Sequence, residues 1–323
     1  MALNTQAAEP IDSAAVGAAP RPARRRLGLP PMTAKLAAGL VLGGAILFFG
    51  LVGPLFVQDP AEVHDLGLAG PSAAHLLGTT QTGQDVLAQL AYATRGSLTV
   101  GAIVGVLTLL LSAFFGVVGP YAGGWLDELF SLFTNVVLVI PGLPLVIVIS
   151  SYVPDKSLWL VALVLSITGW AGSARVLRGY TLSLRSRDYV LAARVAGEKR
   201  SRILAVEILP NLIPLLASQV VFAVIFAILG EAGLSYLGLG ASGSFTWGTM
   251  LYYAQNGLAL RLGAWWWFVP PGLLLALFGA ALSLINFSID EIINPKLRNQ
   301  TRAARRGWRM SRQQLEKARE ATL

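Results

Sequence analysis

The sequence predicts an all-α membrane protein with six transmembrane helices. Only 13% of the 323 residues are charged and 54% are apolar, whereas a typical soluble domain is about 25% charged. The mean hydropathy is +0.62. So little charge could not cover a water-soluble globule, and lipid is therefore expected to surround most of the chain. The spacing of the apolar windows and the placement of the cations supply the details.

Six apolar windows are long enough to cross a bilayer, which needs roughly 20 residues as a helix. The first window begins after Lys35. It is too long and too far along the chain for the apolar region of a signal peptide, so we expect it to remain as a membrane anchor. The predicted spans are about 36–57, 97–119, 129–152, 158–177, 211–233 and 267–289.

The cations fix the expected orientation of these spans. Of 25 Lys and Arg residues, five precede the first span, eight lie between Arg175 and Arg202, and nine follow Pro295. Loops rich in Lys and Arg stay on the cytoplasmic side of a membrane. With six spans, these three blocks share one side, so both termini are predicted to be cytoplasmic.

The same pattern divides the chain into regions. Residues 1–34 are rich in Ala, Pro and Arg and are predicted to be a disordered basic tail. Residues 35–296 form the six-span membrane domain, with outer segments at 58–96 and 234–266, and 297–323 form a basic cytoplasmic tail. Within the second outer segment, the sequence TWGTMLYYAQN predicts a short helix.

Composition and motifs exclude several classes of function. The chain has no cysteine, so it has neither a disulfide nor a thiolate metal site. Its two histidines, His64 and His75, are too few for a strong metal site. No G-x-x-x-x-G-K-[ST] motif occurs, so ATP hydrolysis at a phosphate-binding loop is excluded. We expect no catalytic residue and no cofactor bound by this chain.

The segment 179–210 between spans four and five is far longer than a simple connection requires. Within it, Tyr189, Ala192, Ala193 and Ala196 fall on one face of a helix, and Gly197 is a natural helix end. Pro210 stands where a proline can open the next helix. A face of small side chains suits docking into a cytosolic protein. The alternative is a helix lying on anionic lipid, which would favour bulkier apolar residues.

The third span contains a sequence that is expected to break its helix, Ile140-Pro141-Gly142-Leu143-Pro144. Prolines remove backbone hydrogen bonds, and such breaks are tolerated in a bilayer where protein or a water-filled cavity surrounds them. Pro141 and Pro144 are therefore predicted to bend the wall of a path, the alternative being a packing kink. Ser131 and Asn135 on the same span are candidates for lining it.

Glu231 is predicted at the outer end of span five, as a gate, a contact with a binding protein or an interfacial carboxylate.

Several motifs resemble one family. Leu191-Ala192-Ala193, then Gly197, then Leu209-Pro210 resembles the EAA loop of permease subunits in binding-protein-dependent ABC importers. The segments GTT…GQDVL from residue 78, GPYAGGWLDE from residue 119 and ILGEAGLSYLGLG from residue 228 also resemble this family. Together the matches cover about 35–298, and they are most similar to the C-type subunit of the dipeptide/oligopeptide (peptide/nickel) group.

The resemblance implies a type I ABC importer permease fold and a set of partners. These are a homologous B-type permease, two cytosolic ATPases that hold ATP and magnesium, an extracytoplasmic substrate-binding protein and membrane lipid, without nucleic acid. The location implied is the bacterial inner membrane. The cargo implied is di- or oligopeptides, with nickel chelates or another small solute as alternatives. The residues implied to dock on the ATPase are Tyr189, Ala192, Ala193, Arg194, Gly197 and Glu198.

The chain also departs from the family pattern. Leu191 replaces an acidic residue and Glu207 a histidine in the loop. Gln84 and Gln89 replace arginines, and Leu132 and Asn135 stand where the family often has an Arg and an Asp. Two rivals from other classes are an ion-coupled secondary transporter and a membrane scaffold. The first would transport without an ATPase, and the second would bind lipid or a signalling protein through the loop.

Overall fold

The computed structural model describes residues 33–153, 157–241 and 243–293. Over these ranges the chain is helical; it has two isolated β-bridges, Val63–Gln84 and Thr79–Asp85, and no β-strand. The predicted tails, 1–34 and 297–323, lie almost entirely outside the described residues. The elements are α1 (Ala34–Val52), the 3₁₀ turn η2 (Gly53–Leu55), α2 (Val86–Ala113), the π turn η3 (Phe114–Val118), α3 (Gly119–Ala122), α4 (Trp125–Val139), α5 (Gly142–Tyr152), α6 (Leu158–Arg185), α7 (Asp188–Val195), α8 (Arg200–Ile203), the π turn η4 (Leu204–Ile208), α9 (Leu209–Tyr236), α10 (Trp247–Asn256) and α11 (Trp265–Ile293).

Five helical stretches of the described chain are long and apolar enough to cross a membrane. They are Ala34–Leu55, Val86–Ala122, Leu158–Arg185, Arg200–Tyr236 and Trp265–Glu291. The sequence predicted six spans, with a proline break in the third, and it is the third that differs here. There α4 and α5 meet at a bend of 82°, so a sixth span exists only if this bent pair is counted as one.

The bend has a local cause. Ile140 precedes a proline, which disfavours the helical conformation for the residue before it. Both Ile140 (φ −72°, ψ 123°) and Pro141 (φ −67°, ψ 113°) adopt extended backbone angles. The helix therefore stops at Val139 and restarts at Gly142 in a new direction.

Some span ends also differ from the predicted ones. Helix α2 begins at Val86 rather than near 97 because Asp85 caps it, its Oδ1 accepting from the Ala88 N–H at 2.7 Å. Helix α6 continues past 177 to Arg185. Pro210 lies in the first turn of α9, as expected, but α8, η4 and α9 follow one another as a single helical stretch. The region between α6 and this stretch is thus much shorter than the predicted loop.

Helix α2 packs against both α6 and α9, and α1 packs against α11. Close approach depends on glycine where α2 meets α9: a Cβ atom on Gly101 would lie 2.9 Å from Ile228 Cδ1, and one on Gly105 would lie 2.7 Å from Val224 Cγ2. Small residues at such contacts let helices pack closely in lipid, where no hydrophobic effect drives their association.

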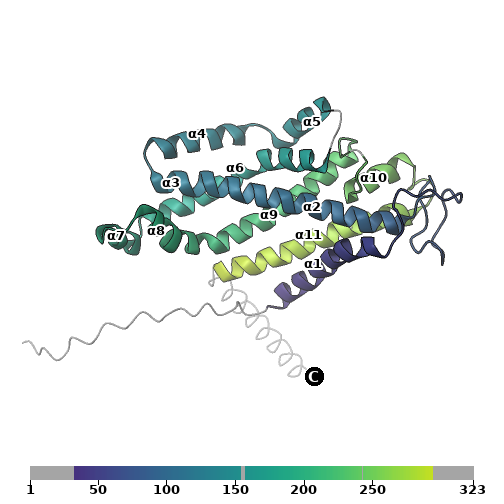
Figure 1. Cartoon of the computed structure of the whole chain (residues 1–323), viewed down its shortest axis with the longest axis horizontal. Coiled ribbons are helices and arrows are strands. Elements are labelled where there is room, and N and C mark those ends of the chain that lie inside the picture. The colour runs from purple at the N-terminus through teal and green to yellow at the C-terminus, as the bar shows by residue number, and fades with distance from the viewer. Residues whose placement is uncertain (1–32, 154–156, 242, 294–323) are drawn as a thin grey trace, which may run out of the picture. The chain divides into compact units, whose positions relative to one another are not determined.

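The short helix predicted in the second outer segment is α10. Its first residue, Trp247, is fully buried; its backbone N–H donates to Ser97 Oγ at 3.0 Å and its indole Nε1 to Thr94 Oγ1 at 3.0 Å. These bonds fasten α10 to α2. Along the long helices, α10 lies at one end, whereas α7 and α8 lie at the other (Figure 1).

Candidate functional site

Helix α7 carries the residues that the sequence predicted to dock on a partner. Val190 is fully buried in a cluster with Leu177 and Ile203, which anchors the helix to the rest of the protein. On the predicted docking face, Tyr189, Ala192 and Ala196 are exposed and Ala193 is half-buried. The structure therefore brings the predicted residues onto a short, anchored helix with a face of small side chains open to the surroundings.

The end of α7 is a glycine turn. Gly197 has φ +77°, a left-handed conformation that is costly for residues with a Cβ atom. The Gly197 N–H donates to Arg194 O at 3.0 Å and the Glu198 N–H to Ala193 O at 3.1 Å, which together form a Schellman cap. A Cβ atom on Gly197 would meet no atom within 4 Å, so the requirement for glycine here is conformational and not steric.

Polar contacts hold the segment after this turn to α3, and α3 to α6. Tyr121 donates its hydroxyl to the backbone oxygen of Arg200 at 2.8 Å, and Arg185 Nη1 donates to Pro120 O at 2.9 Å. The Arg194 guanidinium lies 5.9 Å from the centre of the Tyr121 ring, within range of a cation–π interaction. Glu198 forms an ion pair with Arg202 one helical turn later. Arg194 and Glu198 are thus engaged in contacts within this chain, Arg194 with α3 and Glu198 with α8.

An ion pair that the sequence did not reveal joins α4 to α6 at the same end. Arg178 donates from Nε and Nη2 to the two carboxylate oxygens of Asp127, both at 2.9 Å. One helical turn away, Arg175 Nη2 donates to Asn135 Oδ1 at 2.7 Å. The partners are far apart in the sequence, so no local pattern could have indicated either contact.

The four predicted path residues of the third span lie in α4, in α5 and, for Pro141, in the bend between them. Ser131 is half-buried, whereas Asn135, Pro141 and Pro144 are exposed. They stay candidates for the path, since each is at least partly accessible. Glu231 differs from them: it is buried in α9, at 1% exposure, and so is not a surface carboxylate.

Glu231 joins α9 to α10. Its Oε1 accepts from Ser235 Oγ at 2.6 Å and from Thr246 Oγ1 at 2.7 Å. Thr246 is the N-cap of α10 and exchanges hydrogen bonds with Thr249 in a capping box. Through these hydrogen bonds, the Glu231 side chain holds α10 to α9 in this conformation.

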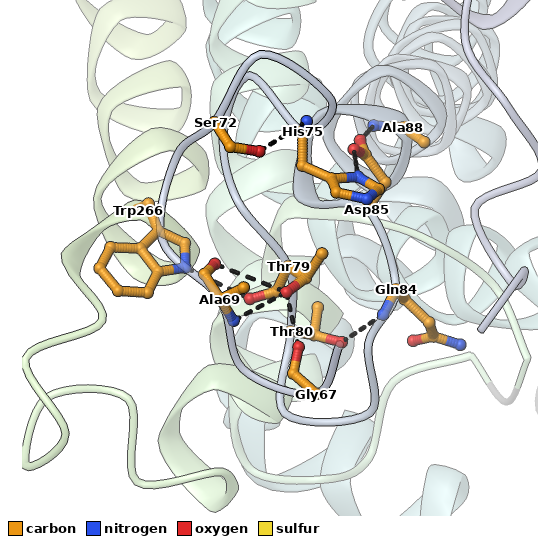
Figure 2. Close-up of polar contacts among 10 residues, drawn as sticks. All are labelled: Gly67, Ala69, Ser72, His75, Thr79, Thr80, Gln84, Asp85, Ala88 and Trp266. Carbon is orange, nitrogen blue, oxygen red and sulfur yellow. Dashed lines mark hydrogen bonds and ion pairs between the residues drawn. The ribbon is translucent and has the colours of Figure 1, made fainter. Parts of the chain in front are cut away.

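The first outer segment is a tightly bonded loop packed against the start of α2 (Figure 2). Thr79 Oγ1 donates to Gly67 O at 2.6 Å and accepts from the Ala69 N–H at 2.8 Å. Trp266 Nε1 donates to Thr79 O at 3.2 Å. His75 Nδ1 lies 2.7 Å from Asp85 Oδ2. Thr79 and Asp85, which both belong to the segment GTT…GQDVL, therefore hold this loop to α11 and to the start of α2.

Comparison with known proteins places these features in a family. Residues 109–299 match the family described as "Binding-protein-dependent transport system inner membrane component". The dipeptide transport system permease protein DppC of Bacillus subtilis (strain 168) is 34% identical over 271 residues, which are 82% of this chain and 83% of that protein. The oligopeptide transport system permease protein OppC of the same organism is 33% identical over 270 residues, 82% of this chain and 87% of that protein.

A more distant relative and a solved structure agree with these matches. The oligopeptide transport system permease protein OppC of Mycobacterium tuberculosis (strain ATCC 25618 / H37Rv) is 31% identical over 240 residues, covering 74% of this chain and 81% of that protein. A chain of the MetNI methionine ABC transporter, solved in inward-facing conformations, aligns with a TM-score of 0.51 and 17% identity, covering 64% of this chain and 95% of that one. The latter likeness is one of fold.

Proposed function

This chain belongs to the family of binding-protein-dependent transport system inner membrane components, and we propose that it is the C-type permease subunit of an ATP-driven peptide importer. The resemblance seen in its motifs is confirmed by the family match and by the relatives at 34% and 33% identity. The chain is an inner-membrane protein. Peptides are the proposed cargo because the names of these relatives specify dipeptide and oligopeptide transport.

The proposed complex contains this chain, a homologous B-type permease, two cytosolic ATPases and an extracytoplasmic substrate-binding protein. The chain lacks a phosphate-binding loop of its own, so ATP and magnesium belong to the ATPase subunits in this proposal. The two permeases would together enclose the path, with Ser131, Asn135, Pro141 and Pro144 as the candidate lining of this half. The binding protein would deliver the peptide.

The proposed topology counts α4 and α5 as one bent span, which gives six spans with both termini cytoplasmic. Helix α7 would then face the cytosol, and α10 and the loop of Figure 2 would face outward. The main support is the exposed face of α7 at one end of the long helices. That face consists of Tyr189 and small alanine side chains, and it is held in place by the buried Val190 and the Gly197 turn. We propose it as the ATPase-docking surface.

Two substitutions at one position test the docking surface. Ala192 is exposed at the centre of the face. Ala192→Trp places a large side chain between the surfaces, whereas Ala192→Ser keeps a small one. We expect Ala192→Trp to abolish co-purification of the ATPase and ATP-driven peptide uptake, with normal membrane insertion, and Ala192→Ser to retain both. Equal ATPase capture by the two variants would exclude α7 as the docking element.

A further inference from the structure

A cleft of about 600 Å³ lies at the α10 end of the protein. Its walls come from the first outer segment, the first turn of α2, residues 243–245 before α10, α10 with Gly257, and the start of α11. Its volume lies within the range of about 300–1,000 Å³ that is usual for small-ligand sites. A protein–protein contact, in comparison, normally buries a broad surface of about 800 Å² on each partner. The cleft is therefore large enough to hold a small ligand.

The lining is electrically neutral and combines apolar surface with a few polar groups. Every lining residue that the structure describes is uncharged. Amide groups come from Gln84, Gln89 and Asn256, and hydroxyl groups from Thr80 and Tyr253. A charged ligand would lose its hydration here without gaining an ionic partner. A ligand with neutral donors and acceptors would lose much less.

The amide groups of the cleft are held in position before any ligand binds. Gln89 is 6% exposed, and its Nε2 donates to Gln84 Oε1 at 2.8 Å and to Pro60 O at 3.5 Å. Gln84 Nε2 in turn donates to Ala61 O at 3.3 Å. These two side chains therefore present fixed, uncharged amide groups at the cleft.

A second observation points to a missing ligand group. Trp267 lines the cleft and is 4% exposed, yet its buried indole N–H has no hydrogen-bond partner among the described residues. Buried polar groups of this kind are nearly always partnered. The ring is held by Gly257, where a Cβ atom would come within 2.5 Å of it. Because the nitrogen itself is buried, an acceptor supplied by a ligand would satisfy this donor if the ring shifts toward the cleft.

We propose that this cleft binds the main chain of a short peptide, as an outer site that the cargo occupies before the transmembrane path. An extended main chain alternates N–H donors with C=O acceptors, and side-chain amides can serve both. Because no charge is available for a terminal ammonium or carboxylate, recognition is independent of the peptide's termini. The inference rests on the proposed function, which places the α10 end outside the membrane and makes peptides the cargo.

The test uses the full chain, purified in lipid nanodiscs, and a tetrapeptide that is acetylated at its N-terminus, amidated at its C-terminus and carries one photoreactive leucine. Crosslinks are located by mass spectrometry, and affinities come from competition with the unreactive peptide. We expect saturable crosslinks within 80–89 and 243–257. Asn256→Leu should weaken binding roughly five- to tenfold, the loss expected for about one hydrogen bond. Gln255→Leu, on an exposed neighbour outside the cleft, should change affinity less than about twofold.

Gln84→Leu repeats the test in case Asn256→Leu impairs folding, which the thermal unfolding midpoint reports. Crosslinks outside the cleft, crosslinks that the unreactive peptide does not displace, or equal effects of Asn256→Leu and Gln255→Leu would each overturn the proposal. So would tenfold tighter binding of a peptide with free termini, or binding that appears only when the extracytoplasmic protein is added. ATP-driven uptake is measured in parallel. Uptake without cleft binding refutes this inference alone, whereas failure of the chain to associate with an ATPase refutes the proposed function.

Discussion

At the scale of single residues, Gly197 and Glu231 each determine the geometry of one end of the molecule. Gly197 has a positive φ and lets the chain turn from α7 into α8. Glu231 is buried and bonds both its own helix and the first turn of α10. One residue acts through backbone conformation and the other through hydrogen bonding, so they call for different substitutions.

For Gly197, alanine and asparagine separate conformation from size. Gly197→Ala should destabilise the turn by roughly 1–2 kcal/mol, because φ +77° is strained for alanine. Asparagine tolerates this region better, so Gly197→Asn should cost less. The measurement is the rate of tryptic cleavage between Arg194 and Arg200, expected to rise about tenfold for alanine if the turn opens locally. An unchanged rate for Gly197→Ala would show that the turn does not depend on glycine.

For Glu231, the loss of an acceptor should matter more than the loss of charge. Glu231→Leu leaves the Ser235 and Thr246 hydroxyls without their acceptor, at a cost of roughly 1–3 kcal/mol. Glu231→Gln keeps a carbonyl oxygen in place and should cost less. The thermal unfolding midpoint of the purified chain reports both. If leucine proves as stable as glutamine, these hydrogen bonds do not hold α10 to α9.

The sequence located these residues but not their contacts. Gly197 could be recognised as a helix end from the alanine pattern before it. Glu231 could be placed near the end of span five, but its bond to Thr246 depends on how α10 folds back onto α9. The Asp127–Arg178 pair likewise joins residues 51 positions apart. Contacts of this kind arise from packing, which no local pattern encodes.

At the scale of elements, glycines determine how closely the helices approach. Gly105 of α2 faces Val224 of α9, where a Cβ atom would come within 2.7 Å of Cγ2. Overpacking a contact of this kind costs typically 1–3 kcal/mol. Gly105→Val should therefore lower the unfolding midpoint. Gly44→Val on α1 is the matched control, because a Cβ atom there meets nothing within 4 Å. Similar unfolding midpoints for the two variants would show that α2 and α9 can move apart without a loss of stability.

The helix bounds in the structure differ in part from those that the apolar windows of the sequence predict. Apolar windows predicted the centres of the long helices well, because a bilayer requires apolar residues only within its own thickness. They placed the ends poorly: α2 begins at its Asp85 cap and α6 continues to Arg185, beyond the apolar windows. The prolines of the third span predicted a break, but not that the chain would turn by 82°.

At the scale of the whole molecule, the proposed topology can be tested because the native chain contains no cysteine. Ser186→Cys lies between α6 and α7, and Leu260→Cys lies between α10 and α11, where Leu260 is 78% exposed. A maleimide that cannot cross membranes should label Leu260→Cys on intact spheroplasts. It should label Ser186→Cys only after the membrane is opened. Labelling of both on intact spheroplasts would contradict the proposed orientation.

The continuity of α8, η4 and α9 has a mechanical consequence. Their 37 residues, Arg200–Tyr236, amount to a rod of about 55 Å at 1.5 Å per residue. It starts just beyond the Gly197 turn, and Glu231 near its far end holds the cap of α10. If α7 docks on an ATPase as proposed, a displacement there would be transmitted along this helix as a tilt or a slide, except where the π turn and Pro214 allow it to flex. In the proposed function, this single helical stretch would connect the ATPase-docking surface on α7 with the α10 end of the protein.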